Sequence, residues 1–244
     1  MKKVILKNGV RFIYEKRDIN ISSFCVGFDA GALREENEFK YGTAHALEHM
    51  LYKGTTKRSE KEINSISDEV FGFSNAMTNY PYVIYYGTTL LKDFEKGLEL
   101  YSDIVLNPAF IEEGFKEEIN VIYEELREWE DDLTKYCEDM LLFNAFNKRR
   151  IKDRIIGSWS DLEQLSLQDI KSFYYKYYIP VNCVISVVTS MDFDNVYFLI
   201  DKYFGNWENK KSIYLGNNYE DNIEAVFVED VRNMQGAKIQ YCFP

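Results

Sequence analysis

Residues 42–55 read "GTAHALEHMLYKGT" and contain both histidines of the 244-residue chain. On an α-helix, His45 and His49 differ by about 40° around the axis, so their rings can converge on one point. Glu48 lies about 60° to the other side of His45, on the same surface. The opposite face carries the apolar residues of the stretch, namely Leu47, Met50 and Leu51. We therefore expect a helix that packs one side into a core and presents two imidazoles and a carboxylate on the other.

The residue types on the polar face are those of a metal site. Neutral imidazole is the commonest zinc ligand, and a nearby carboxylate that does not bind the metal can act as a general base toward water. The arrangement HxxEH, here "HALEH", is the inverse of the HExxH zinc motif. A bare HxxEH also fits a surface cluster in which the glutamate pairs with a histidine.

A third ligand must come from Asp, Glu or Cys, because the chain has no third histidine. The acid-rich stretch "FKEEINVIYEELREWEDD" (115–132) has a helical apolar stripe made of Phe115, Ile119, Ile122, Leu126 and Trp129. Glu118 and Glu125 fall about 60–80° from the centre of this stripe, along one edge, whereas Glu124 points into water. Edge glutamates also pair commonly with Lys or Arg, so helix geometry alone leaves both readings open.

Composition limits the class of protein. Hydrophobic residues make up 46% of the chain and aromatic residues 16%, which indicates a packed globular fold. The formal net charge of −11 argues against nucleic-acid binding and gives no attraction to anionic membranes. No apolar run approaches a membrane span or a signal peptide. The four cysteines form no CxxC pair, so we expect reduced thiols and a cytoplasmic location.

The chain mixes helices and strands without strict alternation, which predicts an α+β fold with a mainly antiparallel sheet flanked by helices. A hairpin is expected around Asn8-Gly9, and further strands at 22–33, 72–90 (two, broken near Pro81), 182–190, 222–230 and 237–244. Helices are expected at 59–71, 91–106, about 112–147, 160–178 and 192–204. Ser59 with Glu62 predicts a capping box, and Ser160 another cap. Residues 208–222 are the most linker-like, and the end within a strand pattern suggests a fragment of a longer chain.

Together these residues resemble the M16 peptidases, which are inverzincins and include pitrilysin, insulin-degrading enzyme and the mitochondrial processing peptidase. "HALEHMLYKGT" (45–55), followed by Glu125 within "EEINVIYEE", is similar to the zinc motif of that family. The likeness extends to "LKNGVRFIYEK" (6–16), "FSNAMTNYPYVIYY" (73–86) and "RIIGSWSDLEQLSLQDIKSFYYKYYIPVNCVISVV" (154–188). It covers nearly the whole chain and implies a single zinc-binding N-terminal domain over residues 1–244, with the LuxS/MPP-like metallohydrolase fold.

The resemblance also implies a role for each matching residue. His45, His49 and Glu125 would bind Zn2+, Glu48 would be the general base, and Glu118 an assisting carboxylate behind a ligand histidine. Asn75 and Ala76 would lie on the strand that an extended peptide substrate pairs with. Manganese or cobalt could take the place of zinc.

Family members typically have two homologous halves, so the resemblance implies that this domain needs a second half for full activity. That half would come from the same chain, from a partner subunit or from a homodimer. Two alternatives to an endopeptidase remain: a non-catalytic binding or assembly subunit, and a LuxS-like lyase with Cys137 as the third ligand.

Overall fold

The computed structural model describes residues 1–36, 38–208, 228–230 and 236–242. Its centre is a six-stranded sheet in the order β1-β2-β6-β3-β5-β4. The strands are β1 (Lys2–Ile5), β2 (Arg11–Lys16), β3 (Ile21–Phe28), β4 (Phe71–Thr78), β5 (Val83–Leu90) and β6 (Cys183–Thr189). Every pairing is antiparallel except β2 with β6. The predicted α+β class and mainly antiparallel sheet are confirmed.

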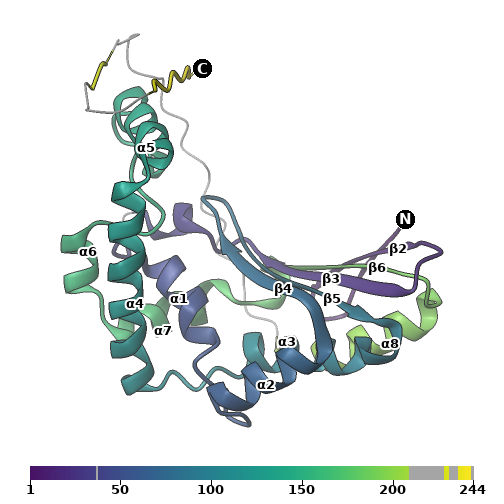
Figure 1. Cartoon of the computed structure of the whole chain (residues 1–244). Helices are drawn as coiled ribbons and strands as arrows, with labels where there is room; N and C mark the ends of the chain where they lie inside the picture. Colours follow the sequence, from purple (N-terminus) through teal and green to yellow (C-terminus); the bar gives the residue numbers. More distant parts are fainter. Residues whose placement is uncertain (37, 209–227, 231–235, 243–244) are drawn as a thin grey trace.

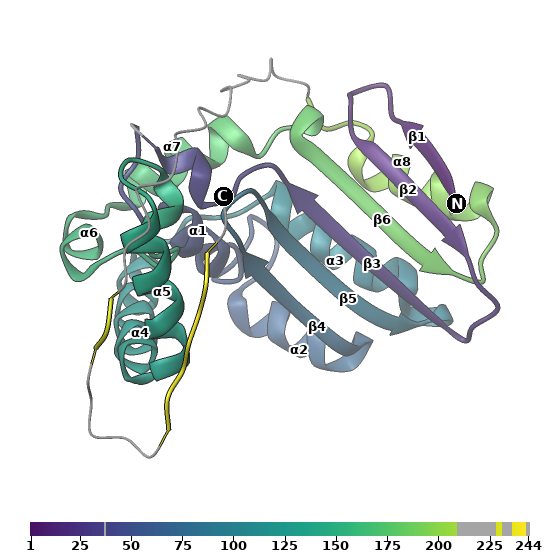
Figure 2. The same ribbon diagram turned by 90° about the horizontal axis from the view of Figure 1, so that it is seen from above.

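Helices cover one face of this sheet and one end of it (Figures 1 and 2). The covered face carries α2 (Glu60–Val70), α3 (Phe94–Leu106) and α8 (Phe193–Phe204). Beside the end of the sheet lie α1 (Thr43–Leu51), α4 (Glu112–Asp131), α6 (Trp159–Gln164) and α7 (Leu167–Tyr177). Helix α5 (Leu133–Ala145) follows α4 and extends away from the body. Within the described ranges no helix lies over the other face of the sheet.

Most expected elements are present with small shifts. Asn8-Gly9 forms the β1–β2 turn, with Gly9 at φ +100°, and the Ser59–Glu62 capping box is formed. The predicted strand at 22–33 ends at Phe28, because Gly31 is pressed against the backbone of the 79–82 turn and a short 3-10 turn follows. The break near Pro81 falls between β4 and β5, as predicted.

Two helix predictions need correction. The long helix at 112–147 is two helices, since Asp132 leaves the helical conformation and caps α5 by accepting from the Thr134 and Lys135 amides. The helix at 160–178 is also two, and Ser160 caps neither. Ser158 and Ser166 are the caps, each in a capping box with an aspartate three residues on. The Ser166 box begins a new helix directly after α6 has ended, which the apolar pattern alone does not reveal.

The last two predicted strands fall partly outside the described residues. Of the strand expected at 222–230, only 228–230 are described, and of the strand at 237–244 only 237–242. None of these described residues is in a strand. The linker-like stretch at 208–222 lies outside the described residues except for Glu208.

A buried ion pair fixes the start of α1. Glu35 accepts hydrogen bonds from the backbone amides of Gly42 (3.3 Å) and Ala44 (2.7 Å), which are free at the first turn of a helix. Its other partner is Arg150, whose guanidinium lies 2.8 Å away, and both side chains have no exposed surface. Gly42 itself has φ +92°, and a Cβ there would meet the Ile156 carbonyl at 2.5 Å. The helix that carries both histidines is thus anchored at its first turn.

We predict that Arg150→Met destabilises the fold by about 3–5 kcal/mol, because it leaves the Glu35 carboxylate buried without its cation. Equilibrium unfolding in urea measures this change. Arg127→Met is the matched control, since Arg127 is 58% exposed in a pair with Glu124 and should cost less than about 1 kcal/mol. Equal unfolding midpoints for the two variants would contradict the role given to the buried pair.

Candidate metal centre

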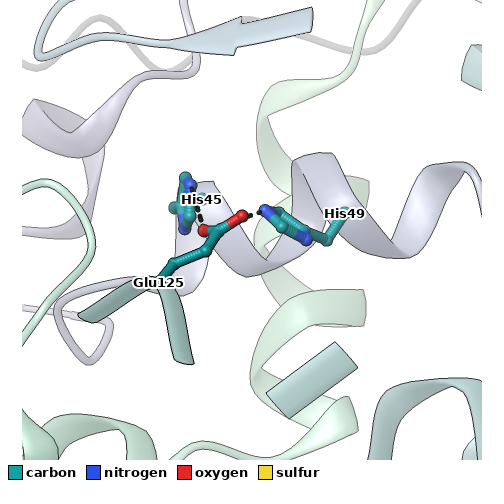
Figure 3. Close-up of side chains that lie close together, drawn as sticks. All are labelled: His45, His49 and Glu125. Atoms are coloured by element: carbon teal, nitrogen blue, oxygen red, sulfur yellow. Dashed lines mark ion pairs between the residues drawn. The ribbon is translucent and has the colours of Figure 1, made fainter. Parts of the chain in front are cut away.

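The amphipathic character of α1 orients the candidate site. Leu47, Met50 and Leu51 are at most 1% exposed and lie in the hydrophobic core. With that face fixed, His45 and His49 project from the other side of the helix, with ring centroids 4.7 Å apart. Figure 3 shows both rings directed at the side chain of Glu125. The face assignment made from helical spacing is confirmed.

Glu125 comes to the histidines from α4. Its Oε2 atom lies 3.7 Å from His45 Nε2 and 3.6 Å from His49 Nε2. One ligand atom from each of the three residues lies within 4.8 Å of the others, the one such group of His, Cys, Asp or Glu found in the described part of the chain. Two ligands held about 2.0–2.1 Å from a tetrahedral zinc ion lie about 3.3–3.4 Å apart. The observed separations are close to that value, so the donor set and its spacing fit a divalent metal.

Glu118, the other edge glutamate of α4, lies behind His49. Its Oε2 atom accepts a hydrogen bond from His49 Nδ1 at 2.9 Å, and its Oε1 atom lies 3.3 Å from Lys53 Nζ. A proton held on Nδ1 leaves the lone pair of His49 Nε2 facing Glu125. Lys53 also binds Glu60 and Glu117, at 2.8 and 3.0 Å. Sequence reasoning missed Lys53, which lies in the turn after α1, although a lysine four residues after His49 was a usable signal.

The two histidines differ in their electrostatics. Burial lowers the pKa of His45 to about 3, and the neighbouring His49 adds to that effect, so His45 is neutral at physiological pH. Burial also acts to lower the pKa of His49, but the hydrogen bond that its ring donates to Glu118 and the charges of Glu125 and Glu48 outweigh it and leave that pKa raised. The pKa of Glu118 is lowered: burial acts to raise it, and His49 and Lys53 outweigh the burial.

Glu48 takes no part in the three-residue group but lies beside it. Burial raises the pKa of its carboxyl group, against opposing effects of Thr78 and His49. Its Oε2 atom accepts a hydrogen bond from the Thr78 hydroxyl at 2.5 Å. Thr78 is the last residue of β4, and sequence reasoning did not single it out.

One open cleft unites the predicted site residues. It is lined by His45, Glu48, His49, Glu118 and Glu125, and by Asn75 and Ala76 of β4. Strand β4 is at the edge of the sheet, so within the described chain its outer side has no strand partner. The Asn75 side-chain oxygen accepts a hydrogen bond from the Ala76 amide at 2.9 Å. The structure therefore brings all the predicted positions together, while their roles stay predictions.

Cys137, the third ligand required by the lyase alternative, does not join this group. It lies on α5, with its sulfur 4.0 Å from the Lys238 carbonyl oxygen. The place beside the histidines is occupied by Glu125.

The family assignment follows from a comparison with known families. Residues 11–158 match the model described as "Insulinase (Peptidase family M16)", and residues 164–244 match the "Peptidase M16 inactive domain". This chain belongs to peptidase family M16. The matched region contains α1, β4 and the part of α4 with Glu118 and Glu125.

Individual relatives agree with this family. The chain is 30% identical to "Uncharacterized zinc protease YmxG" of Bacillus subtilis over 86% of its own length and 51% of that protein. It is 28% identical to the human mitochondrial-processing peptidase subunit beta, over 82% of this chain and 41% of that protein. It therefore spans about half the length of the curated relatives it matches.

The fold also matches solved structures. A crystal structure of a protease from Helicobacter pylori superposes with a TM-score of 0.81 at 27% identity, covering 91% of this chain and 54% of that one. In the described residues no helix is both long and apolar enough to cross a membrane.

We predict that His45→Ala and Glu125→Ala each abolish stable binding of a divalent metal, because either change leaves only two of the three ligands. The measurement is metal content after reconstitution with zinc and gel filtration, by elemental analysis. Glu124→Ala is the control: it is the preceding residue on α4, its side chain is 66% exposed, and it should leave the metal content unchanged. Retention of metal by Glu125→Ala would remove Glu125 from the ligand set.

Proposed function

We propose that this chain is the zinc-binding domain of a metal-dependent endopeptidase. The observation that carries the proposal is the convergence of His45 Nε2 and His49 Nε2 on one Glu125 oxygen, with Glu48 beside them. Family membership and the zinc-protease names of its relatives support the choice of Zn2+. A bound zinc ion would supply Lewis acidity toward a water molecule and toward a peptide carbonyl.

Glu48 is the proton carrier in this proposal. Its Oε2 atom accepts a hydrogen bond from the Thr78 hydroxyl, which orients the carboxylate that would accept a proton from the attacking water. The same carboxyl group then donates that proton to the leaving amine. Burial favours the protonated form of Glu48, which brings its proton affinity closer to that of the groups with which it exchanges.

The peptide would lie along β4. An extended segment can pair with the free edge of this strand through main-chain hydrogen bonds, which gives affinity with little sequence demand. Asn75 and Ala76 are the β4 residues in the cleft, so a peptide paired there passes the two histidines. In this arrangement the Ala76 amide exchanges its bond with the Asn75 side chain for one with the substrate.

A second homologous half is part of the proposal. The chain covers 41–51% of relatives such as the mitochondrial subunit and the Bacillus protein, and the cleft is open in the described residues. The second half would come from the same polypeptide, a partner subunit or a second copy, and would close the cleft. We keep a cytoplasmic location as a proposal, to be tested by fractionation of cells that express the full gene.

The alternative function is a non-catalytic binding or assembly subunit. It would keep this fold and bind a peptide along β4 without cleaving it. A complete ligand set with a carboxylate beside it favours the enzyme, because a binding subunit has no need of either.

We predict that Glu48→Gln lowers peptidase turnover about 10²–10⁴-fold while zinc content stays the same, because glutamine fills the same space but accepts no proton. The assay measures cleavage of an internally quenched peptide by the full-length protein, with zinc analysed in parallel. Glu124→Gln serves as the control for loss of an exposed carboxylate. Unchanged turnover in Glu48→Gln would refute the proton-carrier role, and a zinc-loaded wild type without turnover would favour the binding subunit.

A further inference from the structure

Thr78 connects the edge strand to the proton carrier. Its hydroxyl donates to Glu48 Oε2 at 2.5 Å, and its backbone amide also bonds the Glu48 carboxyl group. Thr78 is itself 9% exposed, so the threonine side of this bond is buried. We propose that Thr78 is a positioning residue that fixes the Glu48 carboxylate relative to a peptide on β4. The inference rests on the proposed function.

The hydroxyl lies on the side of β4 that faces the site. Side chains alternate along a strand, so Ser74, Ala76 and Thr78 share one face. Ser74 and Ala76 line the cleft, and Thr78 reaches Glu48 from the same side. A peptide that pairs with Ala76 is thereby placed two residues from the side chain that holds the carboxylate.

Backbone contacts fix where Thr78 lies relative to α1. The turn that follows β4 accepts two hydrogen bonds through its carbonyls, from Ala32 to Asn79 (3.0 Å) and from Leu33 to Tyr80 (2.7 Å). The packing is tight, because a Cβ at Gly31 would lie 2.2 Å from the Asn79 oxygen. The segment that donates these bonds leads directly into Glu35.

Glu35 completes the connection, since it binds the first amides of α1. The β4–β5 turn is bonded to residues 31–35, and Glu35 is bonded to the start of α1. Helix α1 carries Glu48, and Glu48 is bonded to Thr78 at the end of β4. Such a closed loop of contacts restricts the orientation of the carboxylate, because Oε2 is held by the Thr78 hydroxyl.

The test compares Thr78→Val, which removes the hydroxyl at nearly constant shape, with Thr78→Ser, which keeps it. Thr89→Val is the matched control: Thr89 is on the neighbouring strand β5, 1% exposed, and its hydroxyl has no hydrogen-bond partner in the described part of the chain. In the full-length protein we expect Thr78→Val to lower kcat about tenfold with KM and zinc content unchanged. Thr78→Ser should restore most of kcat, and Thr89→Val should match wild type.

A second measurement needs no catalysis. The thermal midpoint of the metal-free protein is measured for Thr78→Val, Glu48→Ala and the double variant. We expect Thr78→Val to lower the midpoint by a few degrees in the wild-type background and by much less when Glu48 is absent, because the two effects share one bond.

The outcomes separate this inference from the proposed function. A coupled midpoint with lowered kcat and serine rescue supports the positioning role. Additive midpoints, an unchanged kcat in Thr78→Val, or a Thr78→Ser variant as slow as Thr78→Val would overturn it. Failure of the proposed function shows differently, as a wild-type protein that holds zinc without cleaving peptides, and the midpoint cycle still decides whether Thr78 holds Glu48.

Discussion

The buried carboxylate of Glu35 is the contact on which the site geometry depends. It satisfies two amides at the first turn of α1 and is balanced by Arg150, which comes from a distant part of the chain. A helix anchored only by its apolar face could still slide or rotate by several degrees. The hydrogen bonds to the Gly42 and Ala44 amides remove that freedom, and His45 follows directly after Ala44. The separation between the His45 ring and Glu125 is therefore set by a contact that contains no site residue.

The site itself could be predicted from the sequence to the extent that it rests on periodicity. Helical spacing alone placed His45, His49 and Glu48 on one face and Leu47 on the other, and the edge position of Glu125 along α4 made it a candidate. Nothing in that spacing decided between Glu125 and Glu118, which are nearly in line on one helix. The choice depends on how α4 packs against α1 in the tertiary structure. Glu125 lies close to Nε2 of both rings, and Glu118 accepts a hydrogen bond from Nδ1 of His49.

Two further contacts could not be predicted from the sequence, because they too depend on tertiary packing. Thr78 and Glu48 are 30 positions apart and meet because two elements pack together, and Arg150 reaches Glu35 across 115 positions. Local signals were misread where two of them overlapped. Asp132 ends one helix and caps the next, and Ser166 caps a new helix two residues after the preceding one ends, so the continuous apolar pattern predicted single helices where the structure has pairs. Capping side chains allow a break at these points, because they supply partners for the amides that lose their intrahelical carbonyls where a helix restarts.

The electrostatics of the cleft explain why one histidine has a carboxylate behind it and the other does not. His45 Nδ1 is buried without a hydrogen-bond partner in the described residues, and the surrounding apolar atoms hold the ring neutral. His49 donates a hydrogen bond to Glu118, which raises the proton affinity of the ring and makes His49 Nε2 a stronger metal ligand. Lys53 binds the other oxygen of Glu118 and, together with His49, lowers the pKa of that carboxyl group. The row of Lys53, Glu118, His49 and Glu125 thus places a neutral imidazole between two carboxylates, of which Glu118 is paired with an ammonium group, and a divalent cation would lie between His49 Nε2 and Glu125.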